Sequence, residues 1–255
     1  MVNTSLLVER LKKVGWHYTA NQLDGLLEDA SKNNVTYSAF LYTLLTHEIE
    51  QKESVAFQRR MVKAKLPFRK TVHEFDFSFQ PSIQEKRVKE VVTCRYITSG
   101  ENIVLVGPPG VGKTHLAIAF GMEAITQGYS TLFVTAADFV SSCRKAQEKG
   151  TVERCIQRWL RPDVLIMDEV GYFPFDEISA NLFFQVVSKR YERGSIILTS
   201  NKSYIEWGKI FGDEVLATAI LDRLMYHVTT FNIKGNSYRL KEKQKAGILP
   251  ATLER

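Results

Sequence analysis

Residues 102–117 read NIVLVGPPGVGKTHLA, and the central eight, Gly107–Thr114, match the pattern G-x-x-x-x-G-K-[ST]. The pattern follows a short β-branched run and opens a helical one, the context in which it forms a phosphate-binding loop. Glycines let backbone N–H groups turn inward around an anion, and the following helix adds its N-terminal dipole. Lys113 is expected to reach the β- and γ-phosphates, and the Thr114 hydroxyl to bind Mg²⁺. The residues expected to contact the nucleotide are Gly107, Pro108, Pro109, Gly110, Val111, Gly112, Lys113, Thr114 and His115.

The rest of this half alternates in the same way. Strand-like runs at 102–107, 130–136, 163–169 and 195–201 are separated by helical stretches, including 113–128, 138–147 and 179–194. Strands that alternate with helices predict parallel βαβ units and a sheet covered on both faces. The expected fold is therefore α/β, a three-layer sandwich around a central parallel sheet.

Two of these runs end in polar residues. Asp168 and Glu169 follow the apolar run VLIM, and Asn201 follows SIILTS. Parallel sheets bind ligands beyond the carboxyl ends of their strands, so these side chains are expected beside the phosphate loop. Asp168 fits the Walker B acid that holds Mg²⁺, Glu169 is predicted to orient the attacking water, and Asn201 to sense the γ-phosphate or hold that water. Asn201 as a simple strand-ending turn is the alternative.

The residues after that strand also distinguish the nucleotides. Guanine-specific proteins use N-K-x-D, but Asn201-Lys202-Ser203 is followed by Tyr204. The aspartate that reads guanine is missing, and this favours ATP. Arg223, in a short helical stretch, is either an arginine finger supplied to a neighbouring molecule or part of a salt bridge, for example with Asp222.

The N-terminal part has a different pattern. Residues 1–66 carry helical apolar spacing and predict a small all-helical domain, with one long helix starting after Thr36-Tyr37. Residues 67–82 read as a linker, and alternating Phe75, Phe77 and Phe79 are expected to anchor it onto an ATPase domain of residues 83–255.

Composition limits the possible partners and compartments. The 255 residues carry a net charge of +6, which favours an anionic partner such as nucleic acid. Three cysteines without a CxxC pair argue against a disulfide framework or structural zinc. The chain has neither a run of roughly 20 apolar residues nor a secretory leader pattern. These features predict a cytoplasmic protein without a membrane span.

With these parts together, the chain resembles the AAA+ ATPases of the DnaC/IstB group, particularly the IstB helpers of insertion-sequence transposition. The resemblance covers nearly the whole chain and rests on FDFSFQPS, GPPGVGKTHLA, DEVGYFPFD, TSNKSYIEW, ILDRLMYH and IKGNSYRLK. It implies a Mg²⁺-dependent ATPase that oligomerises on duplex DNA, with nucleotide between subunits, and assists a transposase in choosing target sites. It also implies that Arg223 acts in trans and suggests Arg239, in SYRLK, as a second nucleotide-sensing arginine. Too little chain follows Asn201 for the full C-terminal lid of many AAA+ proteins.

The resemblance further implies DNA contacts in the helical insertion before the Walker B strand, without base-specific readout. The basic residues there are Arg144, Lys145, Lys149, Arg154 and Arg158. A second basic cluster, Arg59, Arg60, Lys63 and Lys65, is either a phosphate-contacting arm or a solvated helix face. Two other functions share these features: a replicative helicase loader, and a nucleotide-gated DNA scaffold in which hydrolysis is incidental.

Overall fold

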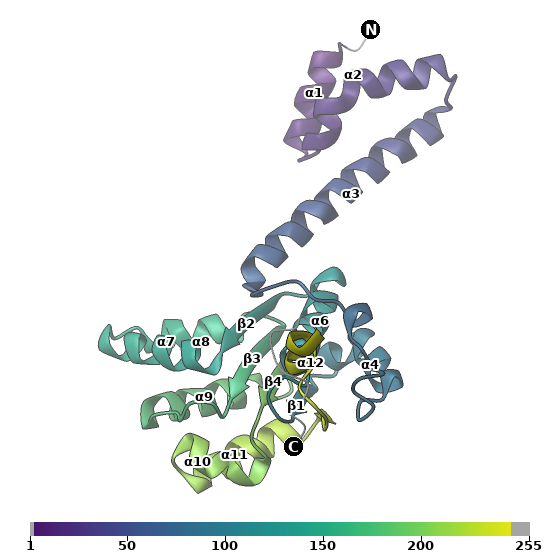
Figure 1. Ribbon diagram of the computed structural model, residues 1–255. Coiled ribbons are helices and arrows are strands. Elements are labelled where there is room, and N and C mark those ends of the chain that lie inside the picture. Colours follow the sequence, from purple (N-terminus) through teal and green to yellow (C-terminus); the bar gives the residue numbers. More distant parts are fainter. Residues whose placement is uncertain (1–2, 246–255) are drawn as a thin grey trace. The chain divides into compact units, whose positions relative to one another are not determined.

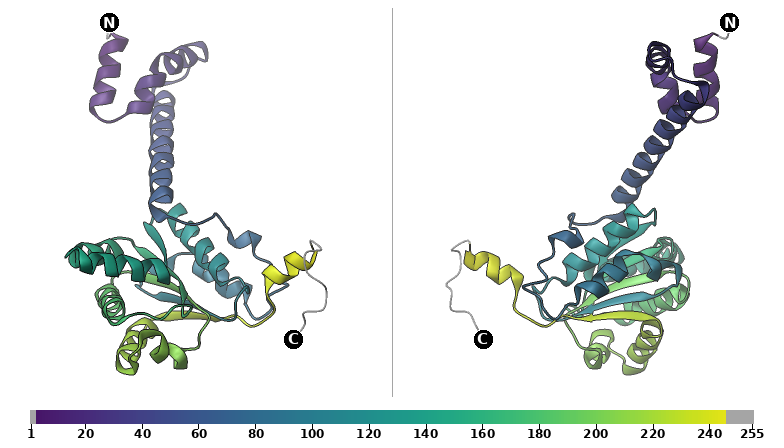
Figure 2. Two further views of the ribbon diagram at one scale, coloured as in Figure 1. Left: turned by 60° about the vertical axis from the view of Figure 1, so that its left-hand side comes forward. Right: turned by 90° about the vertical axis from the view of Figure 1, so that its right-hand side faces the viewer.

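The computed structural model describes residues 3–245, with side chains described as far as Lys241. The chain divides into two compact units between Arg59 and Arg60. Each unit has its own architecture (Figures 1 and 2).

The first unit is helical. It contains α1 (Thr4–Lys13), α2 (His17–Lys32) and most of α3 (Tyr37–Ala64), the single long helix predicted from the sequence. Its interior is small, and the carboxylate of Glu48 is buried within it. Glu48 Oε2 accepts hydrogen bonds from the backbone N–H of Thr19 (2.9 Å) and from its hydroxyl (3.0 Å). These bonds and nearby Lys52 outweigh burial and lower the pKa of Glu48, so the acid joins α2 to α3 as a carboxylate.

The second unit is the predicted α/β sandwich. Its strands are β1 (Asn102–Val106), β2 (Thr131–Thr135), β3 (Val164–Val170), β4 (Ser195–Ser200) and β5 (Val228–Asn232). They form one sheet in the order β2-β3-β4-β1-β5, and every neighbouring pair is parallel. The helical segments are η1 (Val72–Glu74), α4 (Glu85–Val92), α5 (Arg95–Thr98), α6 (Lys113–Thr126), α7 (Ala136–Glu148), α8 (Val152–Leu160), α9 (Glu177–Arg190), η2 (Tyr204–Glu206), α10 (Trp207–Phe211), α11 (Glu214–Met225) and α12 (Tyr238–Lys245).

Side chains of successive strand residues point to opposite faces, and this creates two cores. Leu165 and Met167 of β3 pack with α7, α9, α10 and α11. Val164 and Ile166 pack on the other face with α4 and α6. Both faces are therefore covered, as a parallel sheet requires (Figure 1).

One strand was missing from the prediction. β5 reads VTTFN, pairs with β1 at one edge of the sheet, and has only Phe231 buried. Such a strand lacks the continuous apolar run that marks the central ones.

Candidate functional site

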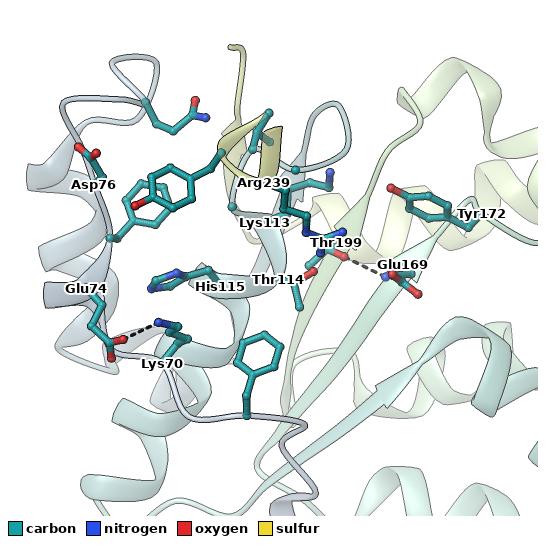
Figure 3. Close-up of a pocket in the computed structure, with 17 residues that line it drawn as sticks. Lys70, Glu74, Asp76, Lys113, Thr114, His115, Glu169, Tyr172, Thr199 and Arg239 are labelled. Carbon is teal, nitrogen blue, oxygen red and sulfur yellow. Dashed lines mark hydrogen bonds and ion pairs between the residues drawn. The ribbon is translucent and has the colours of Figure 1, made fainter. Parts of the chain in front are cut away.

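A cavity of about 300 Å³ lies at the carboxyl edge of the sheet (Figure 3). Three parts of the second unit enclose it: the phosphate loop with the start of α6, the linker segment 68–80, and α12. Its lining includes Gly110, Val111, Gly112, Lys113, Thr114, His115, Glu169 and Arg239. The structure thus brings most of the predicted nucleotide contacts to one place. Gly107, Pro108 and Pro109 belong to the same loop but do not line the cavity.

The phosphate loop holds its lysine inside. Lys113 is buried, and its Nζ donates hydrogen bonds to the carbonyl oxygens of Gly107 and Pro108, both at 2.7 Å. The pKa of Lys113 is lowered to about 8, chiefly by burial and also by the charge of Arg239, whereas Asp168 and Glu169 act in the opposite direction. An anionic phosphate in the cavity would supply the counter-charge that two carbonyls only partly provide.

Asp168 is the best-organised acid of the site. It is 3% exposed, and both carboxylate oxygens accept from Thr114 Oγ1, at 3.0 and 3.1 Å. Thr199 Oγ1 donates to Asp168 Oδ1 at 2.6 Å. Burial raises the pKa of Asp168, and these hydroxyl bonds partly oppose the rise. A hydroxyl and a carboxylate oxygen in contact are the protein ligands that Mg²⁺ takes alongside nucleotide phosphates, so Thr114 and Asp168 fit this ion.

Glu169 points away from Asp168 because the strand contains an extra residue. β3 pairs Met167 with Leu198 and then Val170 with Ser200, which leaves Asp168 and Glu169 opposite Thr199. This is a β-bulge, and Glu169 adopts a left-handed backbone with φ of 63°. The Glu169 N–H, displaced from the ladder, donates to Thr199 Oγ1 at 2.9 Å (Figure 3). The bulge exposes the Glu169 carboxylate to the cavity while Asp168 stays buried.

Thr199 was not predicted from the sequence, yet it joins both acids. It is 1% exposed and lies inside a strand, where a threonine is ordinary. Its partners, Asp168 and Glu169, are 31 and 30 residues away, so only the alignment of β3 with β4 reveals the contact.

Asn201 follows β4 but does not line the cavity. Its Oδ1 is buried and has no hydrogen-bond partner among the residues that the structure describes. It lies against Gly171, where an added Cβ would come within 2.9 Å of it. Gly171 has φ of 104° and begins the turn after β3. The amide oxygen is thus available to accept from a water near the end of the bulged strand.

The segment after the acids, residues 170–176, has a mixed structural task. Val170 and Phe175 are buried in the core, and the Asp176 side chain caps α9 by accepting from Ser179 N–H at 2.8 Å. Tyr172 lines the cavity, and Phe173 is 57% exposed. The segment therefore anchors the turn that follows Glu169 and presents the Tyr172 ring to the cavity.

Arg223 lies outside the cavity of its own chain. Its Nη1 donates to the Ala219 carbonyl at 3.1 Å, and its guanidinium lies 4.8 Å from the ring centroid of Phe184. No ion pair between Arg223 and Asp222 is present in the described structure. Within one chain, Arg223 does not line the site that holds Lys113.

The predicted basic residues separate into distinct environments. Lys145, Lys149, Arg154 and Arg158, together with Arg161, line a groove of about 440 Å³ between α7 and α8, and none of the groove's lining residues is acidic. We refer to it as the α7–α8 groove. Arg144 is outside it and pairs with Asp176.

The other basic cluster is at the end of α3. Arg59 belongs to the first unit, whereas Arg60, Lys63 and Lys65 belong to the second. Arg59, Lys63 and Lys65 are exposed, and Arg60 is half-buried. Across residues 3–245, no helix has the length and apolar character needed to cross a bilayer. In the same part of the chain, no three His, Cys, Asp or Glu side chains are grouped as a metal site.

Comparison with known proteins agrees with this geometry. The chain is 51% identical over 225 residues to a protein of Geobacillus stearothermophilus named as an ATP-binding protein of insertion sequence IS5376, covering 88% of this chain and 90% of that protein. It is 46% identical over 249 residues to one from insertion sequence IS21 of Pseudomonas aeruginosa, covering 98% and 93%.

Solved structures share the fold of the second unit. AMPPCP-bound DnaA from Aquifex aeolicus matches with a TM-score of 0.57 and 23% identity, covering 74% of this chain and 59% of that one. DnaI matches with a TM-score of 0.55 and 20% identity, covering 65% and 92%. These likenesses concern the AAA+ fold alone. A model of the IstB-like ATP-binding protein family matches residues 9–246, and the chain therefore belongs to that family.

Proposed function

We propose that the cavity binds and hydrolyses ATP. The observation that carries this proposal is the pair of acids at the bulge, with Asp168 buried against Thr114 and Glu169 turned into a cavity that also holds Lys113. A simple nucleotide-binding loop needs no carboxylate facing its phosphates, because that charge repels them. A water-activating residue does need one.

Each residue has a distinct task in this scheme. Lys113 exchanges its two carbonyl partners for phosphate oxygens. Thr114 and Asp168 would hold Mg²⁺, which neutralises developing phosphate charge when it is bound. Glu169 orients and polarises the attacking water, and Asn201 holds that water or senses the terminal phosphate. Arg223, which does not line the cavity of its own chain, is supplied by a second copy.

We propose further that the protein binds duplex DNA as an oligomer and assists a transposase. The names of the relatives place them in insertion sequences, and family membership makes the same setting the best one for this chain. The α7–α8 groove offers five cations from α7, α8 and the residues directly after them, which suits phosphate contacts more than base readout. The basic arm at the end of α3 is a second candidate contact for the DNA backbone.

The test uses Glu169→Gln, which keeps the size of the side chain and removes its charge. ATP hydrolysis should fall by at least about a hundredfold, as expected when a positioned water is lost, while binding of a non-hydrolysable ATP analogue persists. Assembly on duplex DNA should form with ATP and then fail to dissociate.

Two results would redirect the proposal. Unchanged hydrolysis would remove Glu169 from the chemistry. Unchanged assembly and disassembly, with hydrolysis lost, would favour the nucleotide-gated scaffold. Pull-down with a hexameric helicase, compared with the transposase, distinguishes a helicase loader from a transposition helper.

A further inference from the structure

Two segments that are far apart in the sequence lie side by side over the phosphate loop. Gln80 Nε2, in the linker, donates to the Asn236 carbonyl at 3.1 Å. The Ser82 hydroxyl donates to the Lys234 carbonyl at 2.9 Å and accepts from the Lys234 N–H at 3.0 Å. The linker is therefore joined to the C-terminal segment 233–241 by bonds that span more than 150 residues of chain.

The same segments are also joined by charge. Lys241 Nζ, on α12, lies 3.2 Å from Asp76 Oδ2 and 4.1 Å from the ring centroid of Phe79. Asp76 is itself fixed, because its Oδ1 accepts from the Ser78 hydroxyl at 2.5 Å and from the Phe79 N–H at 3.0 Å. These bonds, with Lys241, lower the pKa of Asp76 to about 2. The Asp76 carboxylate is therefore charged at neutral pH and can form an ion pair with Lys241 of α12.

The C-terminal segment also touches the phosphate loop directly. The Tyr238 N–H donates to the Gly110 carbonyl at 2.9 Å. Gly110 has φ of 81°, and a Cβ placed there would collide with the side chain of Ser237. Any residue other than glycine would push α12 away from the loop. The start of α12 is thus fixed to the loop itself.

These contacts place Arg239 in the cavity. Arg239 follows Tyr238 at the start of α12, lines the cavity, and lies close enough to Lys113 for its charge to disfavour the charged form of that lysine (Figure 3). Lys113 and Arg239 both face this cavity, and the anionic oxygens of a nucleotide would neutralise both charges. The lysine of such a loop reaches the β- and γ-phosphates. A second cation beside it is therefore expected to interact with the γ-phosphate more than with the α- and β-phosphates.

We infer that Lys241, through its pairing with Asp76, is a positioning residue that holds Arg239 beside Lys113 and so lets the site distinguish a nucleoside triphosphate from a diphosphate. The inference rests on the proposed ATP site and deepens it. Linker and C-terminal segment then act as one structural unit, and a change in either reaches the phosphates through α12.

The test measures equilibrium dissociation constants for a non-hydrolysable ATP analogue and for ADP, both with Mg²⁺, in the full chain. Lys241→Glu reverses the charge that pairs with Asp76 and should weaken binding of the ATP analogue about tenfold, the low end for a charge-assisted contact. ADP affinity should change less than about threefold, because ADP lacks the terminal phosphate. Lys241→Arg keeps the ion pair and the ring contact and should behave like the wild-type protein. Lys234→Glu is the matched control, because only the backbone of Lys234 takes part in these contacts.

A double-mutant cycle with Arg239→Ala separates positioning from general damage. If Lys241 acts through Arg239, Lys241→Glu should add little to the loss of ATP-analogue affinity already caused by Arg239→Ala. Additive losses, or equal losses for ATP analogue and ADP, would overturn the inference while leaving the ATP site intact. Wild-type protein that binds neither nucleotide would instead overturn the proposed function.

Discussion

Replacing Thr199 with valine removes the one hydroxyl that joins both acids of the site, with almost no change of shape. In the native protein the hydroxyl donates to Asp168 Oδ1 at 2.6 Å and accepts from the Glu169 N–H at 2.9 Å. Valine can do neither. Asp168 keeps Thr114 as a partner, whereas the Glu169 N–H loses its hydrogen bond to the Thr199 hydroxyl.

The expected size of the effect follows from these two bonds. A hydrogen bond to a charged group contributes about 1.5–3 kcal/mol, and an ordinary hydrogen bond about 0.5–1.5 kcal/mol. Because one substitution removes both hydrogen bonds of the Thr199 hydroxyl, the free energy of unfolding should fall by about 3 kcal/mol. For a unit of this size, each kcal/mol lowers Tm by roughly 2–4 °C, so a decrease of about 6–12 °C is expected. Because the bulge loses its anchor, Glu169 should move, and ATP turnover should fall at least about tenfold with little change in nucleotide affinity.

The assay combines thermal unfolding, ATP turnover and analogue binding. Thr131→Val is the matched control, because Thr131 is also a buried strand threonine but its hydroxyl only reaches the Gly121 carbonyl at 3.4 Å. The control should lower Tm by only a few degrees and leave turnover near the wild-type value. Thr199→Val with unchanged turnover, or with a loss no larger than that of the control, would refute the assigned role of Thr199.

Three further outcomes test other parts of the site. Binding of a Mg²⁺-bound, non-hydrolysable ATP analogue should weaken about tenfold from pH 7 to pH 9, because Lys113 has a pKa of about 8 without nucleotide and bound phosphate favours its charged form. Calorimetry should show that binding takes up protons. An affinity that does not change with pH would contradict this prediction. Arg223→Ala should lose ATP turnover but keep nucleotide binding. Mixing it with Glu169→Gln should restore part of the activity, because the Glu169→Gln copy supplies its Arg223 in trans to a copy with an intact Glu169. A mixture as inactive as its two components would exclude the trans role. Lys149→Glu should weaken duplex DNA binding and reduce the slope of log affinity against log salt concentration by about 1. The control Lys189→Glu, on the exposed surface of α9, should change neither quantity. Equal effects of the two variants would remove the α7–α8 groove from the DNA interface.

The fold could be predicted from local patterns because the central strands are apolar runs and the phosphate loop fixes a strand before it and a helix after it. β5 could not, since an edge strand with few buried residues carries a weak pattern. The strands that the sequence predicted correctly are those whose buried positions require apolar residues. The division of the chain falls inside α3, between Arg59 and Arg60, where helical periodicity continues without interruption and gives no sign of a boundary.

The candidate site was predictable only where it lies on one segment. Lys113 and Thr114 come from the loop pattern, and Asp168 with Glu169 from the end of an apolar run. The role of Thr199 depends on strand register, and the contact between Asp76 and Lys241 depends on two chain segments meeting in space. Neither relation leaves a periodic signal in the sequence. Simple strand alternation would already point Asp168 and Glu169 to opposite faces, whereas the structure separates them with a bulge.

That bulge creates a conflict between folding and chemistry at a single residue. A side chain in the left-handed region costs roughly 1–2 kcal/mol, and glycine adopts this backbone freely, so Glu169→Gly should fold about as well as the native chain. It would have no carboxylate to hold a water. The native residue is therefore one that local folding preferences alone would not select. A screen that measures only stability would not detect glycine at position 169. Only a measurement of ATP turnover would reveal the substitution.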